Sequence, residues 1–151
     1  MAELKVTAIR EGTVIDHIPA GKGLKVIEIL RLNRPNGGVL LLASNVHSGK
    51  LGRKDIVKIE GKFLSEEEVN KIALIAPTAT VNIVRDYKVA EKFKVEVPGE
   101  ITGILRCANP NCVSNHEYTV SKFYVVSREP LKVRCHYCER TMEEEEILGN
   151  L

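Results

Sequence analysis

The four cysteines of this 151-residue chain all lie in its last third, and their spacing constrains the fold more than any other feature. They form two close pairs, Cys107-x4-Cys112 and Cys135-x2-Cys138, separated by 22 residues. Two such pairs give two short loops that each offer two thiolates to a tetrahedral metal ion, with bonds of about 2.3 Å. The N-terminus has neither the basic nor the apolar region of an export signal, so a disulfide framework is the poorer account. The sequence therefore predicts one structural Zn²⁺ ion per chain, bound by all four cysteines.

Three other interpretations of this segment compete with a structural zinc ion. Cys135 and Cys138 could form a redox pair, but such a pair needs a thioredoxin-like βαβ setting, and the surrounding residues are typical of strand and turn. A catalytic zinc ion would keep an open coordination position, which four thiolates close. His116 or His136 could replace one cysteine as a ligand. A segment of about fifty residues is too small to fold reliably on its apolar core alone, so metal binding is expected to supply folding free energy.

Charge and hydropathy argue against two classes of function. Residues 1–100 carry 16 Lys and Arg against 13 Asp and Glu, whereas residues 101–151 carry 6 against 7, a net charge of −1. A zinc ribbon that binds nucleic acid would need a basic stripe, which this segment lacks. No stretch reaches the roughly 18 apolar residues that a membrane-spanning helix needs. We therefore expect a cytoplasmic protein that contacts neither nucleic acid nor membrane.

Apolar periodicity and turn residues divide the first part of the chain into strands, helices and breaks. Ser65 and Glu68 have the spacing of a helix capping box, and Pro77 ends the helix that they begin. In chain order the sequence predicts a strand over 3–9, a turn at Asp16-His17, a helix over 23–33, strands over 39–46 and 54–64, a helix from 65 to 77, and a strand over 78–97 that is bent or continues as a second strand around Asp86-Tyr87.

This β-α-β-β-α-β order is typical of the ferredoxin-like fold, an antiparallel sheet with both helices on one face. Pro98-Gly99 marks a boundary, after which cysteines and short alternating runs replace the earlier pattern. The sequence thus predicts an α+β chain of two domains. The first, over 1–98, is a ferredoxin-like domain, and the second, over 99–151, is a small all-β four-cysteine zinc domain.

The stretch EGTVIDHIPAGKG, which begins at Glu11, carries the strongest hint of chemistry outside the cysteines. Asp16 beside His17 could be half of a catalytic site, and Gly-Lys-Gly could belong to a phosphate-binding loop. Neighbouring residues of a strand point to opposite faces, however, and the motif holds no Ser or Cys nucleophile. The glycine spacing also fits no Walker loop. An enzyme that uses this motif is therefore the weaker hypothesis, and Pro19 to Gly23 is better interpreted as the start of a helix.

The motifs GTVIDHIPAGKGLKV, GRKDIVKIEGKFLSEEEV and LIAPTATVNIVRDYKV precede the four cysteines, and the resemblance that they carry extends over essentially the whole chain. In this conjunction the sequence closely resembles the regulatory chain of aspartate carbamoyltransferase. The resemblance implies a non-catalytic subunit that forms dimers through its N-terminal domain and joins catalytic trimers through its zinc domain. The implied complex contains six catalytic and six regulatory chains and acts in pyrimidine biosynthesis. Its implied effectors are CTP as inhibitor and ATP as activator, with UTP as a further candidate.

The resemblance also implies a nucleotide site in the N-terminal domain. Main-chain groups of the first strand and Tyr87 would read the base, Asp16 and Lys58 would contact the ribose, and His17 and Lys92 would be cations for the phosphates. The full implied set is Thr7, Ala8, Ile9, Val14, Asp16, His17, Lys58, Asn82, Val84, Tyr87, Val89 and Lys92.

A plainer interpretation exists for several members of this set. A lone lysine on an alternating strand is usually a solvated side chain, and Val84 and Val89 would be ordinary core residues if no ligand bound. In the zinc domain, the resemblance implies that contacts to the catalytic chain come from Asn109, Asn111, Glu139 and Arg140.

Overall fold

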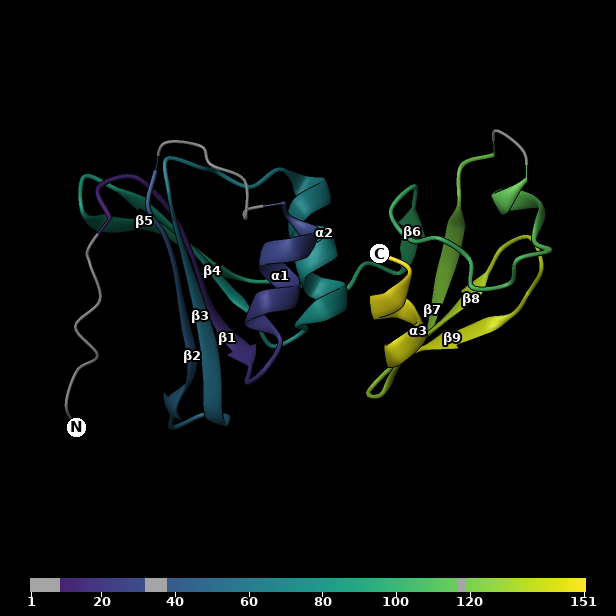
Figure 1. Ribbon diagram of the computed structural model, residues 1–151, viewed down its shortest axis with the longest axis horizontal. Coiled ribbons are helices and arrows are strands. Elements are labelled where there is room, and N and C mark those ends of the chain that lie inside the picture. Colours follow the sequence, from purple (N-terminus) through teal and green to yellow (C-terminus); the bar gives the residue numbers. More distant parts are fainter. Residues whose placement is uncertain (1–8, 32–37, 117–118) are drawn as a thin grey trace. The chain divides into compact units, whose positions relative to one another are not determined.

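A computed structural model describes residues 9–31, 38–116 and 119–151 of the chain (Figure 1). Spatial contacts group the chain into two compact units. The first contains Met1–Ser65 and Thr78–Val95, and the second contains Glu66–Pro77 and Glu96–Leu151. The chain is a mixed α+β protein in which sheets predominate, as the sequence predicts.

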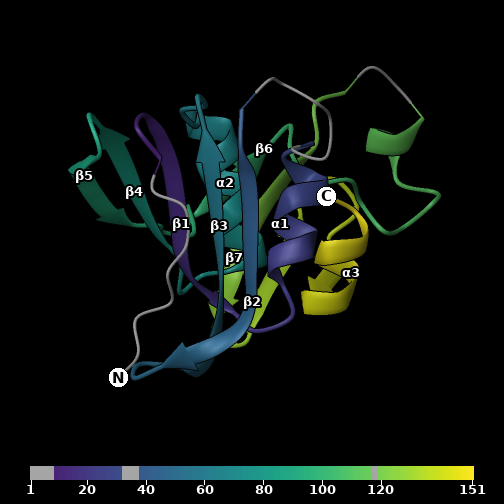
Figure 2. The ribbon, with the colours of Figure 1, turned by 60° about the vertical axis from the view of Figure 1, so that its left-hand side comes forward.

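The first unit is built on one five-stranded antiparallel sheet. Its strands are β1 (Gly12–Pro19), β2 (Leu40–Ser48), β3 (Gly52–Glu60), β4 (Thr80–Arg85) and β5 (Lys88–Lys94). Their order in the sheet is β2-β3-β1-β4-β5, which can be followed from right to left in Figure 2. The order of the first four strands is that of a ferredoxin-like sheet, and β5 extends it as an antiparallel edge strand.

Helix α1 (Gly23–Ile29) packs against β2 and β3. Val26, Ile27 and Leu30 are buried at helical spacing, as the periodicity predicts, while Leu24 is 57% exposed. Gly23 begins the helix where a side chain would be crowded, because a Cβ there would lie 2.6 Å from Leu42 Cδ1 and 2.9 Å from Oδ2 of the buried Asp55. The helix ends earlier than predicted, at Ile29 rather than at residue 33.

The prediction of a turn at Asp16-His17 is wrong, because both residues lie within strand β1. A bulge interrupts this strand: Ile15 pairs with Val57 of β3, but the next pair joins Ile18 to Asp55. The extra residue of the bulge interrupts the alternation of buried and exposed side chains along the strand, which explains why the sequence pattern predicts a turn there. The strand predicted over 3–9 lies almost wholly outside the described residues.

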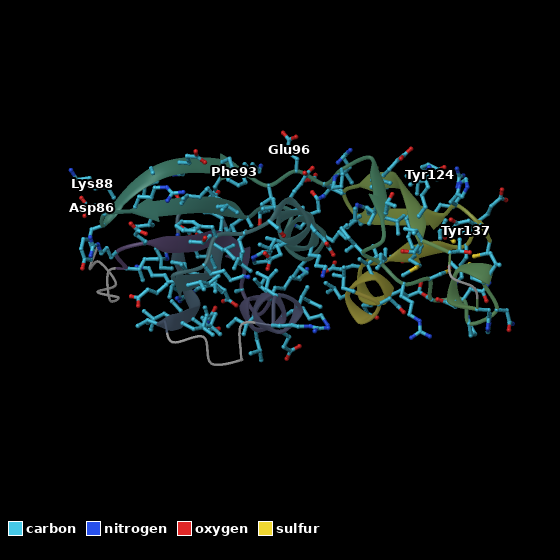
Figure 3. The ribbon with its side chains drawn as sticks, turned by 90° about the horizontal axis from the view of Figure 1, so that it is seen from above. Asp86, Lys88, Phe93, Glu96, Tyr124 and Tyr137 are labelled. Atoms are coloured by element: carbon cyan, nitrogen blue, oxygen red, sulfur yellow. The ribbon has the colours of Figure 1, made fainter. Side chains whose placement is uncertain are left out.

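The strand predicted over 78–97 is a hairpin of β4 and β5, which was one of the two predicted forms. Asp86 and Tyr87 form its turn, with φ of 51° and 65°. Two central residues with positive φ match the twist of a two-residue hairpin. Figure 3 shows Asp86 and Lys88 at the tip of this hairpin and Phe93 farther along β5.

The second unit contains helix α2 (Glu66–Ile75) and a four-stranded antiparallel sheet in the order β6-β7-β8-β9. The strands are β6 (Glu100–Thr102), β7 (Lys122–Arg128), β8 (Leu131–Cys135) and β9 (Thr141–Glu143). The 3-10 turn η1 (Val113–Asn115) lies between β6 and β7, and α3 (Glu144–Gly149) follows β9. Phe123, Val133, Met142 and Ile147 are fully buried in its core. The all-β sheet agrees with the sequence, whereas the short helix α3 was not predicted.

Two parts of the fold prediction stay predictions. One is the position of α2 on the same sheet face as α1, since contacts group α2 with the second unit. The other is the domain boundary between residues 98 and 99.

Candidate functional site

The four cysteines come together at one point of the second unit. Their Sγ atoms all lie within 4.8 Å of one another. Cys112 Sγ lies 3.7 Å from that of Cys135, and Cys107 Sγ lies 3.6 Å from that of Cys138. Four sulfurs around a tetrahedral ion with bonds of about 2.3 Å would be about 3.8 Å apart. The cluster therefore has the size that such an ion needs, and the four cysteines can hold a metal ion as predicted.

Hydrogen bonds fix the backbone of the two loops that carry the cysteines. In the first loop, the Asn115 side-chain amide donates to the carbonyls of Cys107 (3.0 Å) and Asn109 (2.8 Å). In the second loop, the amide of Cys135 donates to the carbonyl of Arg140 (2.9 Å), which closes the turn between β8 and β9. These bonds hold the ligands in place from outside the cluster, as supporting hydrogen bonds do in metal sites.

The thiols differ in how readily they ionise. Burial raises the pKa of the Cys107 thiol to about 12 and also raises the pKa of Cys135. Burial opposes ionisation of Cys112 as well, but hydrogen bonds from the side chain and backbone of Ser114 outweigh it and lower the pKa of Cys112 to about 7. A cation at the centre of the cluster would supply the charge that lets all four groups exist as thiolates.

The two histidines of the cysteine-bearing segment, His116 and His136, each have a partner other than the sulfurs. His116 Nε2 pairs with the carbonyl of Pro110, and His136 Nδ1 lies 2.8 Å from the Tyr124 hydroxyl. The His136 ring also packs edge-on against Tyr137, and Figure 3 labels both tyrosines. Within the described ranges, the metal-ligating group consists of the four cysteines alone.

The four residues expected to contact a catalytic chain lie on the two cysteine loops. Asn109 Oδ1 accepts a hydrogen bond from the amide of Asn111 (3.0 Å). Asn111, Glu139 and Arg140 are exposed, and Arg140 forms a 2.7 Å ion pair with Glu146. Their role in an interface stays a prediction.

Most of the expected nucleotide contacts share one face of the first sheet, here called the outer face. Residues directly opposite one another in an antiparallel sheet point to the same side. Lys58 of β3 pairs with Val14 of β1, Val14 pairs with Asn82 of β4, and Asn82 pairs with Lys92 of β5. Along β1 and β3 the members of this row alternate with buried residues of the opposite face, whereas β5 is exposed throughout. Asp16, Val84 and Val89 lie on the same outer face by register.

His17 occupies the bulge of β1 with a left-handed backbone, φ 57°. Its carbonyl accepts a hydrogen bond from the Thr78 hydroxyl (2.7 Å), and its Nδ1 lies 3.1 Å from the Thr80 hydroxyl. Asp16 Oδ1 accepts the backbone amide of His17 (2.6 Å) and pairs with Lys54 Nζ (2.8 Å). The Asp16 carboxylate therefore does not orient the imidazole, which agrees with the argument against a catalytic dyad.

Positive charges surround this bulge. Burial lowers the pKa of His17; Asp16 opposes that change, and Lys54, Lys50 and Lys92 add to it. Burial raises the pKa of Asp16, but the hydrogen bond from Lys54 and the amide of His17 outweigh it, so the net pKa is lowered. At neutral pH the cluster thus holds an ionised Asp16 paired with Lys54, beside further lysines.

Lys54 and Lys50 are charged members of this cluster that sequence reasoning missed. Lys54 could have been found, because alternation along β3 places it on the same face as Lys58. Lys50 lies in the β2–β3 turn, and its effect on His17 depends on the folded hairpin.

At the other end of the outer face, the expected base contacts differ in accessibility. Tyr87 is 63% exposed and Val89 is 58% exposed, whereas Ile9 and Val84 are buried. Thr7 and Ala8 lie outside the described residues.

The Gly-Lys-Gly sequence is not arranged as a phosphate loop. The amides of Gly21 (3.0 Å) and Gly23 (2.8 Å) both donate to Oδ2 of Asp55, and Oδ1 of Asp55 accepts the amide of Asn45 (2.8 Å). Asp55 is 1% exposed. The amides that could have faced a phosphate are thus used inside the fold, and the segment leads into α1 as predicted.

Across the described residues, no helix is both long enough and apolar enough to cross a membrane.

Two family models match the chain. The model of the allosteric domain of the aspartate carbamoyltransferase regulatory chain matches residues 4–96, and the model of that chain's metal binding domain matches residues 99–148. Relatives named aspartate carbamoyltransferase regulatory chain include a Thermococcus onnurineus protein (90% identity) and a Pyrococcus abyssi protein (81%), each matched over 100% of both chains. A Thermofilum pendens relative of the same name is 56% identical over 98% of this chain and 94% of its own. The chain therefore belongs to the family of aspartate carbamoyltransferase regulatory chains, which are non-catalytic subunits of the transferase.

Proposed function

We propose that the chain binds CTP and ATP, with UTP as a further candidate, on the outer face of its first sheet, and that binding controls an aspartate carbamoyltransferase catalytic chain. The observation that carries the proposal is the row Lys58, Val14, Asn82 and Lys92, which ends beside the cationic cluster at His17. A nucleotide needs an apolar, hydrogen-bonding surface for base and sugar and cations for its phosphates. The outer face offers these features side by side.

Within this site, each group has a role that follows from its chemistry. His17, Lys92 and the additional Lys54 and Lys50 would face the triphosphate, and Asp16 and Lys58 would face the ribose hydroxyls. Tyr87 and Val89, which are exposed at the hairpin end, would cover the base together with main-chain groups of Thr7, Ala8 and Ile9. Val84 would act as a packed support, because this residue is only 6% exposed.

We further propose that the metal is one structural Zn²⁺ ion per chain, held by Cys107, Cys112, Cys135 and Cys138. Four thiolates form a closed shell that suits a structural rather than a catalytic ion. The ion would fix the two loops that carry Asn109, Asn111, Glu139 and Arg140, the expected contacts to the catalytic chain. The proposed assembly is cytoplasmic and contains six catalytic and six regulatory chains, the latter as dimers.

Isothermal titration calorimetry of the metal-loaded chain with CTP and with ATP tests the nucleotide site. We expect saturable heat for the wild type and strongly reduced heat for His17→Ala. Lys25→Ala, which removes a cation from α1, is the matched control and should leave binding unchanged. Absence of heat with both nucleotides at millimolar concentration would reject the proposal. Tight retention of the chain on a nucleic-acid column at about 200 mM salt would favour a nucleic-acid binder instead.

A further inference from the structure

The backbone of His17 is held outside the regular sheet. The β1–β3 register passes from Ile15 to Ile18, and the β1–β4 register ends with Asp16 opposite Thr80, so neither ladder includes His17. Its φ of 57° lies in the left-handed region, which a histidine adopts only when its surroundings favour it. Contacts of His17 outside the strand ladders must therefore stabilise this conformation.

One of these contacts joins the His17 backbone to a distant part of the chain. The amide of His17 bonds the side chain of its own neighbour, Asp16, whereas its carbonyl accepts the hydroxyl of Thr78, 61 positions away. Thr78 lies between α2 and β4 and is half-buried. Its hydroxyl supplies the donor that the interrupted ladder does not give to this carbonyl.

The position of the imidazole depends on this backbone conformation. If His17 relaxed to an extended conformation, its side chain would point to the face opposite that of Asp16, because successive side chains of a strand alternate. The imidazole would then point away from the outer face. The ring would then leave the Thr80 hydroxyl that it contacts and the lysines that, together with the larger effect of burial, lower the pKa of His17. A hydrogen bond to the His17 carbonyl therefore also determines where the imidazole points.

We propose that Thr78 is a positioning residue for the phosphate end of the nucleotide site, acting through the backbone carbonyl of His17. This inference rests on the proposed function, in which His17 faces the triphosphate. Thr78 itself touches no phosphate. Its hydroxyl keeps His17 in the left-handed conformation that places the imidazole among the cations of the outer face.

Two variants of Thr78 and one matched control test this role in the full-length, metal-loaded chain. Thr78→Val removes the hydroxyl and keeps the shape, whereas Thr78→Ser keeps the hydroxyl. Thr13→Val is the control, because the Thr13 hydroxyl also donates to a carbonyl, that of Lys62, over 2.7 Å, but at the opposite end of β1 from His17. A merely structural role predicts the same behaviour for both valine variants.

The first measurement is the Kd for CTP by calorimetry, well below the unfolding temperature. Loss of one hydrogen bond predicts that Thr78→Val weakens binding about fivefold, while Thr78→Ser and Thr13→Val stay within about twofold of wild type. In a double-mutant cycle with His17→Ala, the further change caused by Thr78→Val should shrink to within about twofold. An equal effect of Thr78→Val with and without the His17 side chain would overturn the proposal.

The second measurement is the NMR spectrum of the histidine side chains without nucleotide, in which the His17 signals are those lost in His17→Ala. Thr78→Val should shift the His17 imidazole signals, and Thr13→Val should leave them in place. This readout does not depend on nucleotide binding. If the wild type binds no CTP, the proposed function fails, and unmoved His17 signals in Thr78→Val would separately reject the positioning role.

Discussion

Lys54 and Asp55, two successive residues of β3, fix the EGTVIDHIPAGKG segment from opposite sides of the sheet. Lys54 reaches Asp16 on the outer face, and Asp55 binds the amides of Gly21 and Gly23 on the buried face. Two motifs that are separate in the sequence, GTVIDHIPAGKG and GRKD, thus form one structural unit. A motif with the appearance of a catalytic dyad is in this fold a bulge held in shape by a neighbouring strand.

The Asp55 carboxylate is expected to be a main contributor to the stability of the first unit. Asp55→Ala would leave three backbone amides without their acceptor, and the free energy of unfolding should fall by about 3 kcal/mol. Thermal and urea unfolding measure this loss. Glu91→Ala, on the exposed strand β5, is the control and should change the free energy by less than about 0.5 kcal/mol. Similar small effects of both variants would mean that the three bonds to Asp55 matter little.

The lowered pKa of His17 predicts how nucleotide affinity depends on pH. The imidazole is neutral at pH 7 and gains its proton only as the pH falls below the usual value of 6.5. Because the folded pKa lies below the unfolded one, this group destabilises the free chain as the pH falls through that window. A bound triphosphate favours the charged ring, so CTP affinity should rise over the same window. Calorimetry at several pH values should show that this part of the rise is absent in His17→Ala; identical profiles would contradict the assignment.

At the scale of elements, the sequence predicted what depends on local pattern. The helix over α1, the strands β2 and β3 and the hairpin of β4 and β5 follow from periodicity and from turn residues. The middle of strand β1 was predicted as a turn because its bulge breaks the alternation that identifies a strand, and because the residues that contact the bulge, Thr78 and Lys54, are distant in sequence. Lys50 escaped the site prediction for a similar reason, since its proximity to His17 exists only in the folded hairpin, whereas Lys54 could have been identified from the alternation along β3.

In the β4–β5 turn, Tyr87 is expected to lower the stability of the fold while it strengthens nucleotide binding. Asp86 and Tyr87 both have positive φ, which glycine adopts without strain. Tyr87→Gly should therefore preserve or raise the free energy of unfolding, by up to about 1 kcal/mol, yet weaken CTP binding because the base loses its aromatic contact. Unfolding and calorimetry on the same samples measure both effects.

Asp86→Gly is the matched control for this turn. It relieves the same kind of strain at the neighbouring position and keeps the tyrosine, so binding should be unchanged. If both glycine variants bound CTP as the wild type does, Tyr87 would not belong to the site.

For the whole molecule, the metal and the nucleotide should serve different tasks. Removal of the metal with a chelator, or Cys112→Ala, should unfold the four-cysteine segment, whose small core cannot compensate for the lost binding free energy. The variant should then fail to co-purify with the catalytic chain but still bind CTP through the first unit. Size-exclusion chromatography, metal analysis and calorimetry separate these properties. Loss of CTP binding together with normal assembly would mean that the roles of the two parts are exchanged.

The central claim is that a nucleotide bound near His17 controls a reaction carried out by another chain. The most direct test is the carbamoyltransferase rate of the complex reassembled from catalytic trimers and either wild-type or His17→Ala chains, with and without CTP or ATP. Coupling between two sites of about 1 to 3 kcal/mol predicts a clear nucleotide response with wild-type chains. With His17→Ala chains, the complex should have the same size and a rate that nucleotides barely change. No response with wild-type chains, or an equal response with both, would contradict the account.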